Sequence, residues 1–141
     1  MSALALALLL AAVPAAPTQA PTPHDVVLEM RFSEAMGGGG DMTAVLDFPS
    51  GSQCRDVRRK IWHKLKGADG FLGDCAPSST RARDPRVTHG FSASADLDGG
   101  GAVTAEVGFT SAGLCRAVRR ARAAVDEFSG ALGECRPAGA K

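Results

Sequence analysis

The 141-residue sequence contains no tyrosine, and aromatic residues make up only 5% of it. So few aromatic side chains disfavour a platform for stacking bases and a tyrosine-rich recognition surface. Charge of one sign is also missing, since 16 basic residues stand against 15 acidic ones. A molecule with almost no net charge has no long-range field that would recruit nucleic acid. We therefore expect no nucleic-acid partner.

Patterns of metal ligands are missing as well. There is no Cys-x-x-Cys pair, and the three histidines, His24, His63 and His89, stand at unrelated spacings. A zinc site needs a closely spaced set of such ligands. The segment 96–99 (Asp-Leu-Asp-Gly) opens like a calcium-binding loop but lacks the later ligands and the closing glutamate, so a turn is the better interpretation. We expect no metal and no other cofactor.

The first 15 residues carry no charged side chain and consist mostly of Ala and Leu. Their apolar stretch is too short to cross a membrane but fits a secretory signal peptide, even without the usual preceding basic residue. We expect residues 1–15 to be this signal and residues 16–25 to be a proline-rich tether. A buried N-terminal helix is the alternative, which the four prolines between positions 14 and 23 disfavour. The prediction is a secreted or periplasmic protein, with no transmembrane segment after signal removal.

One motif occurs twice. Residues 48–59 and 109–120 both read Phe-x-Ser-x-x-x-Cys-Arg-x-Val-Arg-Arg, followed about twenty residues later by Gly, an acid and Cys. Self-similarity of this kind indicates an architecture of repeated units. We predict a single domain of two repeats joined by a linker. The predicted bounds are 26–137 for the domain, 26–77 and 87–137 for the repeats, 78–86 for the linker and 138–141 for a loose tail.

Apolar residues alternate with polar or small ones in four runs, two in each repeat. The runs lie near residues 26–32, 42–48, 87–97 and 103–109, and alternation is typical of strands with one wet face. The glycine-rich stretches between the paired runs predict hairpin turns. The four glycines at 37–40 lead into a strand, which disfavours a phosphate-binding loop.

A helical pattern follows each pair of runs. Ser50 and Gln53 form a capping box that starts the first helix, and the second begins after Ser111. The residues expected on their inner faces are Cys54, Val57, Ile61 and Leu65, then Val118, Ala121, Val125 and Phe128. Because each strand has one apolar side, we predict an α+β fold. It is a tandem ββα duplication with one four-stranded antiparallel sheet and both helices on one face.

The four cysteines indicate disulfide bonds, because an even number in a small exported chain is typical of a disulfide framework. Three connectivities are possible for four cysteines. A duplicated unit should carry its own bridge, so we predict the pairs Cys54–Cys75 and Cys115–Cys135. Each bridge closes a loop of about twenty residues, which is worth roughly 3 kcal/mol.

Basic residues recur on the wet side of both predicted helices. The candidate binding residues are Arg55, Arg59, Arg116 and Arg120. Such a patch suits an anionic glycan, a lipid surface or an acidic protein. The alternative is a solvated helix face, with Arg58 and Arg119 laying their stems across the sheet edge.

Catalytic chemistry has little support in the sequence. With all cysteines paired no thiol nucleophile remains, and no serine or carboxylate stands at a spacing that suggests a histidine relay. We predict a non-enzymatic exported interaction module, and keep a small secreted hydrolase as the third possibility.

The second possibility comes from a resemblance. The order strand, strand, helix between two cysteines, exposed loop, Asp-Pro, hairpin and cysteine is similar to secreted subtilisin-inhibitor-like proteins. Cys54, Cys75, Asp84-Pro85 and Cys115 carry the resemblance, which covers roughly half the chain. It implies a serine-protease inhibitor acting through the loop after Cys75, with Arg81 or Arg83 entering the protease pocket. It also implies a Cys75–Cys115 bridge.

Overall fold

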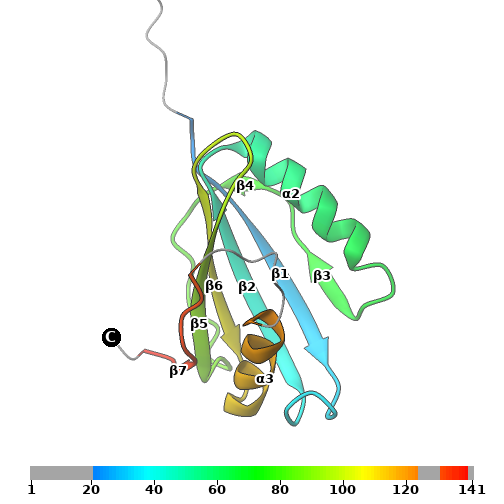
Figure 1. Cartoon of the computed structure of the whole chain (residues 1–141). Helices are drawn as coiled ribbons and strands as arrows, with labels where there is room; N and C mark the ends of the chain where they lie inside the picture. The colour runs from blue at the N-terminus through cyan, green and yellow to red at the C-terminus, as the bar shows by residue number, and fades with distance from the viewer. Residues whose placement is uncertain (1–20, 124–130, 140–141) are drawn as a thin grey trace, which may run out of the picture.

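The computed structural model describes residues 21–123 and 131–139 of the chain (Figure 1). The predicted signal peptide, the first part of the tether, Val125 and Phe128 lie outside the described residues. The fold is α+β, as predicted. No helix within the described ranges is long and apolar enough to cross a membrane.

Nine elements make up the described chain. The helices are α2 (Gly51–Lys64) and α3 (Ala112–Ala123). The strands are β1 (His24–Phe32), β2 (Gly40–Phe48), β3 (Gly70–Leu72), β4 (Ala76–Pro77), β5 (His89–Asp96), β6 (Ala102–Phe109) and β7 (Arg136–Pro137). The four long strands lie where the alternation predicts them. However, β1 begins at His24, inside the segment 16–25 expected to be a tether.

The sheet has seven strands in the described chain, not the four that we predicted. Its order is β3-β1-β2-β6-β5-β7, and β4 also pairs with β1. The four predicted strands form the middle, and short returning segments after each helix extend both edges. The prediction missed these segments because two or three residues are too few to show an alternating pattern.

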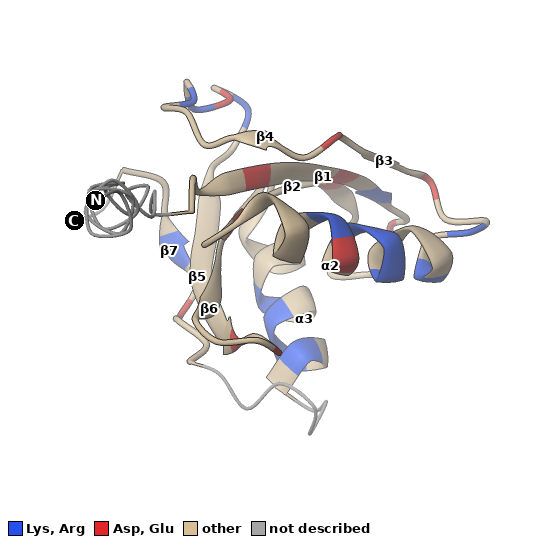
Figure 2. Cartoon of the chain, turned by 90° about the horizontal axis from the view of Figure 1, so that it is seen from above, with Lys and Arg blue, Asp and Glu red and all other residues tan. Residues whose placement is uncertain are grey.

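The sheet is bent, and both helices lie on its concave side, as predicted for one face (Figure 2). In the first half α2 packs on β1 and β2, and in the second α3 packs on β5 and β6. Apolar side chains at alternate positions of the four long strands point into this space, where Phe48, Phe109 and Leu114 are almost wholly buried. Val27 and Val45 are a cross-strand pair on the opposite, convex face. Phe109 stands opposite Met42 across the β2–β6 pair, so the core is continuous between the halves.

Each half holds the start of the other half's helix. The β1–β2 turn reaches α3, where the Ser111 hydroxyl donates to the Gly39 carbonyl at 3.3 Å. The β5–β6 turn reaches α2, where the Gln53 amide donates to the Gly100 carbonyl at 2.7 Å. Ser50 caps α2 as predicted, accepting from the Gln53 backbone N–H. The Gln53 side-chain amide, however, bonds to the β5–β6 turn of the other half and not to its own helix start. The first turn of each helix is therefore held by residues of the other half.

We expect Gly113→Ala to destabilise the fold, although glycine to alanine normally stabilises a helix by about 1 kcal/mol. A Cβ on Gly113 would lie 2.4 Å from the Gly37 carbonyl oxygen, which is rigid backbone. Overpacking of this kind costs about 1–3 kcal/mol. Urea unfolding would measure the effect, and Ser52→Ala at the matching position of α2 should stay within about 0.5 kcal/mol. A Gly113→Ala protein more stable than wild type would contradict this contact.

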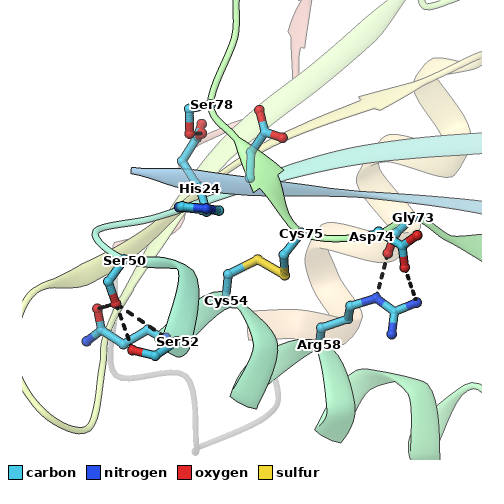
Figure 3. The surroundings of a disulfide bond; sticks show 12 residues. His24, Ser50, Ser52, Cys54, Arg58, Gly73, Asp74, Cys75 and Ser78 are labelled. Atoms are coloured by element: carbon cyan, nitrogen blue, oxygen red, sulfur yellow. Dashed lines mark hydrogen bonds and ion pairs between the residues drawn. A yellow bond between two sulfur atoms is a disulfide. The ribbon is translucent and has the colours of Figure 1, made fainter. Parts of the chain in front are cut away.

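The two disulfides join the predicted pairs. Cys54–Cys75 ties the first turn of α2 to the returning chain (Figure 3), and Cys115–Cys135 does the same for α3. The Cα atoms are 6.1 Å apart in each, within the ordinary range. The Cys75–Cys115 bridge implied by the inhibitor resemblance is therefore wrong. The chain returns past the first turn of each helix, so the cysteine of that helix pairs with the next cysteine in the sequence.

Candidate anion-binding sites

Two arginines of the repeated motif have structural roles. The Arg58 Nε–H donates to the Gly73 carbonyl at 2.6 Å, and the Arg119 Nε–H donates to the Gly133 carbonyl at 2.6 Å. Arg58 also lies 3.2 Å from the exposed Asp74 carboxylate (Figure 3). These bonds anchor each helix to the chain that returns along the sheet edge. The arrangement fits the predicted alternative for Arg58 and Arg119, with stems laid across the edge.

A basic hollow of about 420 Å³ lies between α3 and the β5–β7 edge. Its lining residues are His89, Arg116, Arg119, Arg120, Glu134, Cys135 and Pro137. Arg116 and Arg120 are exposed and lie one helical turn apart. Within the described part of the chain, no carboxylate lies within 4 Å of either guanidinium. Two of the four predicted binding residues therefore meet in one hollow, with their charges uncompensated by ion pairs.

His89 stands at the start of β5, opposite Phe109 of β6 on one side and Pro137 of β7 on the other. Its position in the strand alternation turns it to the concave side, toward α3. The ring Nδ1 lies 3.1 Å from the Thr88 hydroxyl, so one ring nitrogen has a partner on the residue just before the strand. His89 is half-buried and adds an imidazole to the wall of the hollow.

A similar corner lies in the first half. His24 stands at the start of β1, opposite Phe48 of β2 and Pro77 of β4. Figure 3 shows its ring beside the first turn of α2, near the Cys54–Cys75 bridge. A Cβ on Gly51 would lie 3.0 Å from Arg55 Nη1 and 3.1 Å from His24 Nε2. The side-chain nitrogens of Arg55 and His24 therefore both lie next to the position that a Cβ on Gly51 would occupy.

The four candidate arginines do not form one surface. The β2 and β6 strands are antiparallel, so Phe48 and Phe109 end at opposite ends of the central pair. The corner next to Phe48 holds Arg55, and the hollow next to Phe109 holds Arg116 and Arg120. Arg59 lies 3.9 Å from Asp56 on the exposed face of α2. The structure thus has two separate basic groups, one at each end of the sheet (Figures 1 and 2).

Sequence reasoning missed both histidines as site residues. His24 lies 24 residues before Phe48, but His89 lies only 20 residues before Phe109, because the first hairpin is longer. When the two repeats are aligned on their helical motifs, the two histidines therefore fall four positions apart. The alignment does not show that each is paired with the final phenylalanine of its hairpin. The signal that could have found them is a histidine at the first paired position of each hairpin, opposite the final phenylalanine.

The convex side of the sheet is covered in part by the loop after β4, which carries the arginines of the predicted linker. Arg81 makes two hydrogen bonds to Asp25, at 2.5 and 3.4 Å, and the Asp25 side chain is only 1% exposed. Arg86 hydrogen-bonds Asp84 at 2.9 Å, which lowers the pKa of that carboxyl below its usual value. Arg83 is exposed between these two anchored arginines.

A second hollow of about 300 Å³ on the convex side has mixed charge. Among its lining residues, Arg31 lies 3.4 Å and Arg86 3.5 Å from the Asp41 carboxylate. Glu29 and Asp69 add two further acids to the wall. Both of its arginines are therefore ion-paired, whereas Arg116 and Arg120 have no ion pair within the described residues.

Chemistry beyond binding has little geometric support. His24 Nδ1 lies 2.8 Å from the Thr22 carbonyl and His89 Nδ1 lies beside Thr88, so neither contact gives a histidine–carboxylate relay. Over residues 21–123 and 131–139, no group of His, Cys, Asp and Glu side chains is arranged to hold a metal ion. What the two corners offer is positive charge and hydrogen-bond donors. No family model, curated protein or solved structure matches the chain.

Proposed function

We propose that the protein is a small exported, non-enzymatic interaction module that binds an anionic ligand in the basic hollow beside α3. The observation that carries the proposal is the meeting of Arg116, Arg120 and His89 around one hollow, where Glu134 is the one acid among the lining residues. Neither Arg116 nor Arg120 forms an ion pair within the described residues. Arginine forks bind sulfate, phosphate and carboxylate groups in a fixed geometry. The ligand is an anionic glycan, a lipid headgroup or an acidic protein segment. Two disulfides are typical of a protein in an oxidising compartment outside the cytoplasm, which supports export.

We also propose that the two halves descend from one duplicated ββα unit. Three matched features support this in addition to the motif. Each helix is bridged to the cysteine that follows it, each has an arginine bonded to a glycine carbonyl two residues before that cysteine, and each hairpin starts with a histidine opposite the final phenylalanine. On this proposal the two basic corners are versions of one ancestral feature.

The double variant R116Q/R120Q should weaken anion binding about tenfold or more, because each lost charge-assisted contact is worth about 1 kcal/mol or more. Both side chains are exposed, so stability should change by only about 0.5 kcal/mol for each substitution. Retention on immobilised heparin, and on vesicles with and without acidic lipid, measures the binding. Retention of the wild type should also fall steeply with salt, since exposed charges are screened.

The control for this experiment is K60Q/K64Q. It removes the same charge from α2, where both lysines are exposed and away from the hollow. It should keep most of the binding. Equal losses in the two double variants would mean general attraction between charges and would refute the hollow as a specific site. Binding to acidic vesicles but not to heparin would identify a lipid surface as the ligand.

One observation favours the inhibitor as a second candidate function. The loop after β4 is exposed yet anchored: the Ser78 hydroxyl donates to Asp47 at 3.0 Å, and Arg81 binds the buried Asp25. A loop held in this way could enter a protease cleft without losing its shape. Because the Arg81 guanidinium is engaged, the residue proposed for the specificity pocket is Arg83. Stoichiometric inhibition of a trypsin-like protease that is lost in R83A would support this function over the first.

A further inference from the structure

We propose that His24 and Arg55 form a second, independent oxyanion site at the other end of the sheet. It takes a single sulfate, phosphate or carboxylate group, and it does not depend on the hollow beside α3. Arg55 Nη1 and His24 Nε2 both lie about 3 Å from the same point above Gly51. Two nitrogens so placed can contact oxygens of one small oxyanion lying further out over that glycine.

The hydrogen bond at the other ring nitrogen decides how His24 can act. The Thr22 carbonyl can only accept, so His24 Nδ1 carries a proton in this 2.8 Å bond. Nε2 is then an acceptor in the neutral ring and a donor only in the imidazolium. An oxyanion on Nε2 therefore requires the protonated ring, and binding should strengthen as the pH falls.

The groups around the ring favour this behaviour. The strands on either side of His24 bring Phe48 and Pro77, which carry no charge, and α2 brings Arg55. The nearest acids in sequence, Asp25 and Asp47, are a cross-strand pair on the convex face, where Arg81 and Ser78 bind them. On α2 the neighbouring acid, Asp56, lies 3.9 Å from Arg59. Among the described residues neither His24 nor Arg55 forms an ion pair, so an external anion would balance an imidazolium next to Arg55.

Gly51 keeps this space open. It lies in the first turn of α2 with an ordinary negative φ, so alanine fits the backbone there. A methyl group would instead crowd Arg55 and His24 at 3.0–3.1 Å, which is tighter than ordinary contact. At the matching place in the first turn of α3 the chain has Ala112. G51A is therefore a variant that should close the site while leaving the fold intact.

The test is an NMR titration of the full-length protein with sodium sulfate, glycerol phosphate and sodium acetate in parallel, at constant ionic strength. We expect saturable shifts of the His24 ring signals with at least one oxyanion, stronger at about pH 5.5 than at about pH 8, because the anion requires the protonated ring. His63, exposed on α2, is the internal reference. In G51A and in R55Q the affinity reported by His24 should fall at least tenfold, with backbone amide spectra showing that both variants are folded.

The outcomes separate this site from the proposed function. Shifts of His89 alone would leave the hollow beside α3 standing and refute the second site. Shifts of His24 that survive R116Q/R120Q would support the second site whatever His89 does. No saturable His24 shift with any of the three anions, or equal affinity in wild type and both variants, overturns the proposal.

Discussion

Neither half of the chain is expected to fold alone. The fragments 24–78 and 86–141, each with its own disulfide, should give poorly dispersed amide NMR spectra, and mixing them should restore the spectrum of the intact protein. Each fragment would expose the inner edge of β2 or β6, and with it half of the core around Phe109 and Met42. Each would also lose the turn that holds the start of its helix. A unit of about fifty residues buries too little surface to offset its chain entropy.

The matched control for the separate fragments is the folded protein cleaved after Arg83, in the loop between the halves. The nicked protein should stay associated in native buffer, because the β2–β6 pair holds the halves together without a covalent link. In denaturant without reductant the fragments should separate, since neither disulfide crosses the cut. Fragments that remain joined there would mean that the bridges connect the halves. A well-dispersed, monomeric spectrum from either fragment alone would show that the central pair is not needed for folding.

The features of the fold that were predictable are those that repeat over many residues. Alternation fixed the four long strands to within about two residues, and the duplicated motif decided between three disulfide connectivities. The short strands β3, β4 and β7 were not predictable, because their pairing follows from where the disulfides return the chain. The partner of the Gln53 side chain was missed for a related reason. Local capping rules consider one helix, whereas Gln53 contacts Gly100 from the other half.

The candidate site was only partly predictable. The repeated motif identified Arg55, Arg59, Arg116 and Arg120 as exposed, but it could not say that they belong to opposite ends of a sheet. That division follows from the antiparallel β2–β6 register. Arg58 and Arg119 look the same in sequence as their neighbours, and only the carbonyls at Gly73 and Gly133 distinguish them. A helix wheel shows which side chains face outward, and tertiary contacts decide which of these are still available to a ligand.

Replacing Arg81 with alanine is expected to destabilise the protein by about 2–3 kcal/mol, a large loss for a substitution in an exposed loop. Its partner, Asp25, is only 1% exposed and would lose both hydrogen bonds. Removing one member of a buried pair leaves a charge without compensation, which costs about 3–5 kcal/mol when both are buried. The Arg81 side chain is 41% exposed, so water would replace part of the contact and reduce the loss. Urea unfolding of R81A measures it.

Two variants make this result specific. R83A removes an exposed arginine from the same loop and should change stability by about 0.5 kcal/mol or less. D25N/R81A should recover much of the loss, because a neutral amide is less costly to bury than an unpaired carboxylate. If R81A were no less stable than R83A, the pair would not anchor the loop. The loop would then lack the rigidity on which the inhibitor candidate depends, and the basic hollow beside α3 would be the stronger of the two proposed functions.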